Sequence, residues 1–320
     1  MNASGARRPR IVVTLGDPRG IGGEVTRKAL ETLGEDFAAD IVLVGSAPDS
    51  FEGLHADSSS VGQWPGGTDD DAGRAAGSAI GAAVRLIRDG GADALVTAPI
   101  DKAAARKAGW THPGHTEMLA TLTESETVGM LMNSERTALG GPLRVLLATT
   151  HIPLREVPQS LTYGGLVRQV VLLEASLHDD WGIPSPRIAL CALNPHASDG
   201  GLFGDEEAEV LEPVVSTCRG KGIDISGPIP ADTVFLRAVR GEFDAVVSPY
   251  HDVGMAAFKT VSFGGGVNVT LGLPFPRTSP DHGTALDIAG QDRADPGSMV
   301  EAIRLAARLT RGFDTPPPAP

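Results

Sequence analysis

Three histidines follow strand-like apolar runs in this chain of 320 residues. LRVLLATTH ends at His151, RIALCALNPH ends at His196, and DAVVSPYH ends at His251. In a fold of parallel strands the carboxyl ends open onto one edge, so residues far apart in sequence meet there. Neutral imidazole is the commonest protein ligand of transition metals, and three imidazoles with an open position are typical of a catalytic site. The pattern predicts a three-histidine metal site; the alternative is that each histidine only ends a strand in a solvated loop.

Two glycine-containing segments near the amino terminus offer anion-binding groups. GDPRGIGGE (16–24) lies between a predicted strand and a predicted helix, where such turns commonly bind phosphate. Its spacing matches neither the dinucleotide nor the Walker motif, so a tight turn and a ligand loop are both open. Further on, Lys102 follows a predicted strand, and a Pro-Gly turn presents His115 and Thr116, which are donors suited to phosphate or carboxylate.

The acidic residues near these segments have two interpretations. Asp205, Glu206 and Glu207 begin a predicted helix, where carboxylates interact favourably with the helix dipole. We therefore expect no metal-binding role for them. Asp232, in PADTVF, lies just before or at a helix cap, where aspartate is a preferred residue. Capping and catalysis remain alternatives for Asp232.

The densest polar run spans residues 250–290. Asp252 follows the third histidine directly, and lysine is scarce in the chain, yet Lys102 and Lys259 both fall in segments predicted to be loops. In an otherwise acidic protein, Lys259 and Arg277 are candidates to bind an anionic substrate. The small residues of DHGTALDIAG would let a ligand approach the backbone closely.

Alternating strand-like and helix-like runs predict a mainly parallel sheet with helices on both faces. Segment 47–74 is rich in Ser, Gly, Asp and Pro and is predicted to be loop, 135–142 a hairpin turn, and GPIPAD (227–232) another turn. The predicted strands are 11–16, 41–46, 92–99, 143–150, 187–193 and 243–250, and the predicted helices are 21–33, 77–89, 116–123, 162–178, 205–219, 232–240 and 297–311.

Composition limits the functional class. With 41% hydrophobic and 21% charged residues, the chain is typical of a globular protein. Its net charge of -13 argues against binding to nucleic acid or to anionic membranes. Cys191 and Cys218 form no CxxC pair, so we expect reduced core residues in a cytoplasmic protein. No segment resembles a signal peptide or a membrane helix.

The motifs and their order resemble the 4-hydroxythreonine-4-phosphate dehydrogenase family of vitamin B6 biosynthesis. The matching segments are GDPRGIGGE, TAPIDK, PGHTE, LATTHIPLR, LNPHASDGG, PADTVF, YHDVG and GVNVTLGLPFPRTSPDHGTALDIAG. The family fold is similar to that of isocitrate and isopropylmalate dehydrogenases. The segment DHGTALDIAG resembles the cofactor loop of those enzymes. The resemblance implies an α/β fold with two α/β/α subdomains, residues 1–113 with 262–320 and residues 114–261, an active-site cleft between them, and a homodimer with the active site at its interface.

The resemblance also implies roles for individual residues. The metal ligands would be His151, His196 and His251, contributed across the dimer interface. The substrate would be bound by His115, Thr116, Lys259, Asn268 and Arg277. Asp232, Asp252 and Lys259 would lie at the reacting centre, with Asp232 or neutral Lys259 as the proton acceptor. The cofactor would contact Gly266, His282, Gly283, Thr284 and Asp287.

The family oxidises a secondary alcohol with NAD or NADP, after which the β-keto acid loses carbon dioxide. One divalent ion per site, zinc, cobalt or magnesium-like, would hold the alcohol. Related enzymes act on threonate or erythronate 4-phosphate, or on the cis-dihydrodiol carboxylate from terephthalate. This chain departs from the usual family pattern at three positions: Arg19 stands where alanine is usual, Gly23 where proline is usual, and Val253 where glutamine is common. Asp101 lies in a variable position. The exact substrate therefore stays open. A three-histidine metal hydrolase and a non-enzymatic metal or carbohydrate sensor are the alternatives outside the family.

Overall fold

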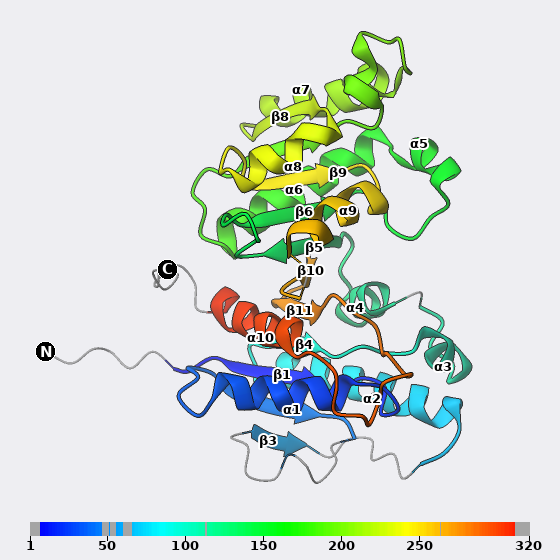
Figure 1. The fold of residues 1–320 in the computed structure, drawn as a ribbon, viewed down its shortest axis with the longest axis vertical. Helices are drawn as coiled ribbons and strands as arrows, with labels where there is room; N and C mark the ends of the chain where they lie inside the picture. The colour runs from blue at the N-terminus through cyan, green and yellow to red at the C-terminus, as the bar shows by residue number, and fades with distance from the viewer. Residues whose placement is uncertain are drawn as a thin grey trace, which may run out of the picture. The chain divides into compact units, whose positions relative to one another are not determined.

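The computed structural model describes residues 7–46, 51, 56–59, 66–112, 114–262 and 264–310, and it divides the chain into two compact units (Figure 1). Unit 1 is Met1–Ser125 with Leu273–Pro320, and unit 2 is Glu126–Gly272. The boundaries expected from the sequence lie earlier in the chain. Helix α4 (His115–Thr123) explains the first difference, because its Met118 and Leu119 belong to the core of unit 1. Strand β10 (Val267–Leu271) explains the second, because it pairs with β5 (Gly129–Ser134) of unit 2.

Unit 1 contains a parallel sheet in the order β3-β2-β1-β4-β11. Its strands are β1 (Arg10–Thr14), β2 (Asp40–Val44), β3 (Ala56–Ser59), β4 (Ala94–Thr97) and β11 (Arg277–Pro280). Its helices, besides α4, are α1 (Gly22–Leu33), α2 (Asp69–Arg88), α3 (Lys102–Lys107) and α10 (Gly297–Leu309). Figure 1 shows the red α10 beside the blue α1, although these helices come from opposite ends of the chain.

The core of unit 1 follows from the alternation of side chains along its strands. Val12 and Leu95 pack against Ile80 and Val84 of α2. The neighbouring residue Val13 is fully buried as well, so β1 is covered on both faces. Burial on both faces is typical of parallel sheets and explains why these strands are continuous apolar runs.

Unit 2 contains a mixed sheet in the order β10-β5-β6-β9-β7-β8. Strand β5 runs antiparallel to both of its neighbours, and the other pairs are parallel. The remaining strands are β6 (Leu143–Leu147), β7 (Arg187–Cys191), β8 (Asp224–Ile229) and β9 (Ala245–Ser248). The helices are α5 (Val157–Ser160), α6 (Tyr163–Asp179), α7 (Glu212–Gly220), α8 (Ala231–Val239) and α9 (His251–Ser262), and a π-helical turn, Glu207–Leu211, precedes α7.

The prediction that segment 47–74 is a loop is wrong at two places among its described residues. Strand β3 pairs with β2, and α2 begins at Asp69 rather than at Gly77. Thr68 caps α2 in a capping box with Asp71, a signal hidden among the acidic residues. Gly77 lies inside this helix, and glycine is needed there because a Cβ would come within 2.0 Å of the Trp110 indole. Residues 47–50, 52–55 and 60–65 lie outside the described residues.

Two other local predictions need correction, and two strands were not predicted. The predicted turn GPIPAD contains the end of β8, and its last two residues open α8. Lys102 and Lys259 are not loop residues, because Lys102 begins α3 and Lys259 lies on α9. Strands β10 and β11 lie in the polar run 250–290, beyond the last strand that the sequence predicted. The sequence signals failed here because glycine, proline and polar residues also occur where strands pair closely.

Both cysteines are core residues, as expected. Cys191 ends β7 and Cys218 lies on α7, and each is buried and unbonded to another cysteine. Burial raises the pKa of the Cys191 thiol to about 12, which keeps it protonated. In the part of the chain that the structure describes, no helix combines the length and apolarity needed to cross a membrane.

Candidate active site

His151 and His251 meet beyond the carboxyl ends of two neighbouring parallel strands. Strand β6 leads to the first and β9 to the second, and the Thr149 hydroxyl joins the two connections by donating to the Pro249 carbonyl at 2.8 Å. The two imidazole centroids are 5.6 Å apart, with planes inclined by 44°. Both rings line a cavity of about 200 Å³ with Thr150, Tyr250 and Leu154 among its other walls.

Asp252 fixes the orientation of one of these imidazoles. Its Oδ1 lies 2.7 Å from Nδ1 of His251. A carboxylate on one ring nitrogen holds the proton there and leaves the other nitrogen as a lone-pair donor, which is the common arrangement behind metal-binding histidines. The His151–His251 pair therefore fits a divalent cation.

His196 lies apart from this cavity, on an exposed turn after β7. Its φ of 53° is followed by 53° at Ala197, 65° at Ser198 and 46° at Asp199, a run of left-handed conformations without glycine. Such conformations cost on the order of 1–3 kcal/mol each and persist only where the surroundings impose them. Among the described residues, no group of three or more His, Cys, Asp or Glu side chains is arranged to hold a metal ion within one chain.

The remaining predicted catalytic residues lie on two helices of unit 2. Asp252 and Lys259 are two turns apart on α9, a separation that puts them on one face of the helix. Asp232 is exposed in the first turn of α8, but Pro230 occupies the cap position. The capping alternative for Asp232 is therefore wrong.

His115, at the start of α4, and Arg277, at the start of β11, form a buried polar centre in unit 1. Arg277 is only 1% exposed, and its guanidinium donates to the Thr97 hydroxyl at the end of β4. Burial lowers the pKa of Arg277 to about 9, against an opposing effect of Glu117, so the side chain stays cationic at neutral pH.

The imidazole of His115 is neutral in this environment. Burial is the main cause that lowers its pKa well below 6.5, followed by the positive charges of Arg277 and Lys102. Its Nε2 is buried without a hydrogen-bond partner. An anionic ligand that accepts hydrogen bonds from the guanidinium would stabilise this buried cation, and the imidazole nitrogen beside it offers a further hydrogen-bonding group.

The other predicted substrate residues are divided between the two units. Thr116 follows His115 on α4 of unit 1, and its side chain is buried. Asn268 lies on β10 of unit 2, with its Oδ1 buried and without a hydrogen-bond partner. Lys259 belongs to unit 2 as well.

The predicted cofactor loop contacts the first glycine-rich turn within unit 1. The Ile21 amide donates to the Thr284 carbonyl at 3.0 Å, and a Cβ on Gly20 would lie 2.8 Å from the same oxygen. Both segments line a cavity of about 570 Å³. The turn 16–24 is therefore both a tight turn and a cavity wall.

The predicted cofactor residues lie in both units, with Gly266 in unit 2 and the other four in unit 1. His282 has a buried Nε2 without a hydrogen-bond partner, and its Nδ1 lies 3.0 Å from the Gly283 carbonyl. Asp287 is exposed and accepts a bond from Gln291 through its backbone. Gly266 is buried in unit 2, just before β10.

Comparison with known proteins assigns the chain to a family. Residues 23–306 match the family model described as "Pyridoxal phosphate biosynthetic protein PdxA". The chain belongs to the PdxA family. A 4-hydroxythreonine-4-phosphate dehydrogenase of Geobacter metallireducens is 41% identical and aligns over 95% of this chain and 96% of its own length.

Solved structures agree with the PdxA assignment. A 4-hydroxythreonine-4-phosphate dehydrogenase from Klebsiella pneumoniae superimposes with a TM-score of 0.82 at 36% identity, covering 95% of this chain and 100% of that one. A terephthalate 1,2-cis-dihydrodiol dehydrogenase from Burkholderia xenovorans gives 0.65 at 28%, covering 94% and 98%. An isocitrate dehydrogenase from Methylococcus capsulatus gives 0.51 at 15%, covering 95% and 88%. That last similarity confirms the predicted fold class.

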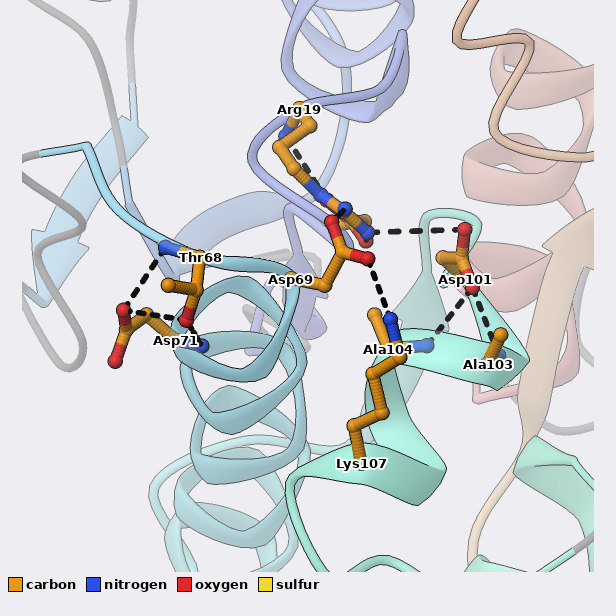
Figure 2. Close-up of polar contacts among 9 residues, drawn as sticks. Arg19, Thr68, Asp69, Asp71, Asp101, Ala103, Ala104 and Lys107 are labelled. Carbon is orange, nitrogen blue, oxygen red and sulfur yellow. Dashed lines mark hydrogen bonds and ion pairs between the residues drawn. The ribbon is translucent and has the colours of Figure 1, made fainter.

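Arg19 and Asp101, both singled out in the sequence, contact one another. Figure 2 shows Arg19 reaching from the first glycine-rich turn toward Asp101, the cap of α3, with Nη2–Oδ2 at 3.7 Å. The same guanidinium bonds the carboxylate of Asp17 at 2.7 and 3.0 Å and pairs with Asp69 at the start of α2. Lys107 of α3 bonds Asp69 at 2.8 Å. Arg19 thus ties the turn to two helices.

We expect Arg19→Ala to lower the free energy of unfolding by about 2 kcal/mol, because it removes the cation from a buried carboxylate. Asp17 is only 1% exposed, and Arg19 itself is 19% exposed. Urea unfolding measures the change. Arg74→Ala is the matched control, because Arg74 pairs with Asp70 on the exposed surface and such a pair contributes about 0.5 kcal/mol or less. Equal losses in both variants would mean that the Arg19 cluster adds no more than a surface pair.

Glu207 is the residue that sequence reasoning interpreted wrongly. It is 1% exposed and accepts hydrogen bonds from the segment that carries His196, so it is more than a partner of the helix dipole. Burial acts to raise its pKa, but bonds from Asn194 and Ser198 outweigh burial and lower it. The only sequence signal was the nearby cluster of Asn194 and Ser198, which are donors that a buried carboxylate needs.

Proposed function

We propose that this chain is a cytoplasmic, homodimeric dehydrogenase that oxidises and decarboxylates 4-hydroxythreonine 4-phosphate with NAD or NADP and one divalent cation. The names of its most similar relatives support this activity. The observation that carries the proposal is the buried Arg277 guanidinium beside the neutral His115 imidazole, in a chain of net charge -13. A buried guanidinium offers a planar set of donors that matches the oxygens of a phosphate or carboxylate.

The substrate-binding residues expected from the sequence keep that role in this proposal. Arg277, His115 and Thr116 would hold one anionic or polar end of the substrate, and Lys259 with Asn268 would bind the remaining groups. Because Asp252 is engaged with His251, we assign Asp252 to orienting that imidazole rather than to proton transfer. Asp232 and Lys259 remain the candidates that accept the hydroxyl proton.

The cation would be held by His151 and His251 of one protomer together with His196 of the partner subunit. The chemistry that such an ion supplies when bound is to acidify the substrate alcohol and to stabilise negative charge on oxygen. The donor set of neutral imidazoles suits zinc, cobalt or a similar ion. A third ligand from the partner would complete the set, because the described residues of one chain group no three such side chains for a metal ion.

Exposed apolar side chains near the histidines support the homodimer. Leu154, shortly after His151, is 67% exposed, and Leu202, shortly after His196, is 71% exposed. Phe203 is 46% exposed. Large apolar groups that are exposed close to an incomplete site mark a surface for a second chain.

The nicotinamide cofactor would bind at the cavity that the first glycine-rich turn lines together with Ala289 and Gly290, the last residues of DHGTALDIAG. Its chemistry is to accept the hydride from the alcohol carbon. Gly283 fits a cofactor contact because no atom lies within 4 Å of a Cβ built there. The exposed carboxylate of Asp287 offers an acceptor for hydroxyl groups.

We expect Gly20→Ala to weaken cofactor binding about tenfold or more, because the added methyl would collide with the Thr284 carbonyl and displace the loop whose Ala289 and Gly290 line the cavity. Isothermal calorimetry with NAD and NADP measures the change. Gly23→Ala is the control, since a Cβ at Gly23 meets no atom within 4 Å and the residue lines the same cavity. If the two variants bind the cofactor equally well, the cofactor does not depend on the Gly20–Thr284 contact.

A substrate panel tests the function directly. The purified chain would be given hydroxythreonine 4-phosphate, threonate and erythronate 4-phosphates, and a cis-dihydrodiol carboxylate, with absorbance of reduced nicotinamide as the readout. We expect kcat/KM to be highest, by about tenfold or more, for hydroxythreonine 4-phosphate. A higher value for another compound would overturn the substrate assignment, and no reduced nicotinamide with any of them would overturn the dehydrogenase assignment.

A further inference from the structure

The turn that carries His196 is held from behind by one buried carboxylate. Oε1 of Glu207 accepts the backbone amides of Leu193 at 2.9 Å and Asn194 at 2.7 Å. Oε2 accepts the Asn194 side-chain amide at 2.8 Å and the Ser198 hydroxyl. The carboxylate therefore grips the segment on both sides of His196.

The donors to Glu207 are all neutral groups of this one turn. A buried carboxylate retains its charge only when hydrogen bonds replace its hydration, so these donors must stay in place for Glu207 to remain ionised inside the protein. The dependence is mutual, because the turn contains four successive left-handed residues without glycine and needs outside contacts to persist. Removing the Glu207 carboxylate would destabilise the turn, and unfolding the turn would leave the carboxylate without its donors.

The backbone that presents Glu207 is itself unusual. Residues Glu207–Leu211 form a single π-helical turn before α7. Such turns are rare and occur frequently at functional sites, where the extra residue shifts a side chain relative to a regular helix. Here the side chain that starts the π-turn points its carboxylate at the turn of His196. The neighbouring Glu206 adds one bond to the Asn194 side chain at 2.7 Å.

We propose that Glu207 is a positioning residue that fixes the left-handed turn and so holds His196 ready to bind the divalent cation of a partner protomer. The role rests on the proposed metal site, but the effect on the turn does not. Carboxylates that order a ligand without touching the metal typically change metal affinity by about 10- to 100-fold. His196 depends on such support because it lies on a turn rather than on a helix or strand.

The test compares full-length Glu207→Gln with Glu209→Gln, which removes the same charge from an exposed position of the same π-turn. Hydrogen exchange of the metal-free protein reports the turn, through the amides of Leu193 and Asn194. Calorimetric titration with Co²⁺ reports His196. We expect Glu207→Gln to lose about tenfold protection at both amides and about tenfold or more in Co²⁺ affinity. Glu209→Gln should match the wild type in both measurements.

Two further variants keep the test decisive if Glu207→Gln does not fold. Ser198→Ala removes one donor, and Glu207→Asp keeps the charge on a shorter side chain. We expect a severalfold loss of Co²⁺ affinity in each. Wild-type affinity in both, or lost amide protection with wild-type affinity in Glu207→Gln, would overturn the positioning role.

Failure of the proposed metal site has a separate signature. Either the wild type does not bind Co²⁺ at all, or His196→Ala binds Co²⁺ with the same affinity as the wild type. Either result overturns the assignment of His196 and with it the purpose we give to Glu207. A wild type that binds Co²⁺ through His196, with a Glu207→Gln variant that binds equally well, overturns only the inference about Glu207.

Discussion

His196→Ala is expected to lower kcat/KM by about a thousandfold or more while leaving the free energy of unfolding nearly unchanged. The large loss follows because the proposed cation would keep only His151 and His251 as ligands. The stability is preserved because the imidazole is exposed, and alanine already occupies the same left-handed conformation one residue later. Steady-state kinetics and elemental analysis of bound metal measure the effect, and urea unfolding checks the fold.

His178→Ala is a matched control for this variant. His178 lies 2.7 Å from the carboxylate of the adjacent Asp179, the same local pairing that His251 makes with Asp252, but on helix α6. We expect its metal content and kcat/KM to equal those of the wild type. Wild-type metal content in His196→Ala would show that this histidine is not a ligand.

Mixing two inactive variants tests whether the site is shared between protomers. In a heterodimer of His196→Ala and His251→Ala, one of the two sites would receive intact His151 and His251 from one chain and intact His196 from the other. Random reassortment of a symmetric dimer would therefore restore about a quarter of wild-type activity. If all three ligands belong to one chain, the mixture stays inactive.

Arg277→Lys is expected to raise KM for the phosphorylated substrate about 100-fold, with a smaller effect on kcat. Lysine keeps the charge but loses the planar fork that binds an anion through two hydrogen bonds. The site magnifies the loss because Arg277 is 1% exposed and water does not replace the missing contact. Initial-rate kinetics separate KM from kcat, and inorganic phosphate as a competitive inhibitor reports binding without chemistry.

Arg144→Lys controls for the general cost of replacing a buried arginine. Arg144 is 8% exposed and pairs with Glu135 in unit 2. This variant should lose stability but keep the wild-type KM and phosphate inhibition. If Arg277→Lys also kept both, the buried guanidinium would not bind the substrate, and the proposal of an anionic substrate at His115 and Arg277 would be wrong.

The sequence predicted most helices and the central parallel strands because their signals are local. Apolar runs and the 3.6-residue period indicate element type without knowledge of neighbours. Of the elements that it missed, β8 and the start of α2 contain glycine, proline or acidic residues, and β10 directly follows a glycine run. Their structure depends on pairing and close packing, as the contact between Gly77 and Trp110 illustrates. Residue composition alone does not encode such contacts.

By itself, the sequence determined the family, the fold class and the position of each histidine after a strand. Only the tertiary structure decided which side chains meet. His151 joins His251 because β6 and β9 are neighbours, while His196 stands on a turn held by Glu207. Burial keeps His115 neutral by lowering the pKa of its imidazole, and the charge of Arg277, far along the chain, lowers that pKa further. These properties arise from strand order and burial, and both depend on contacts between residues that are distant in sequence.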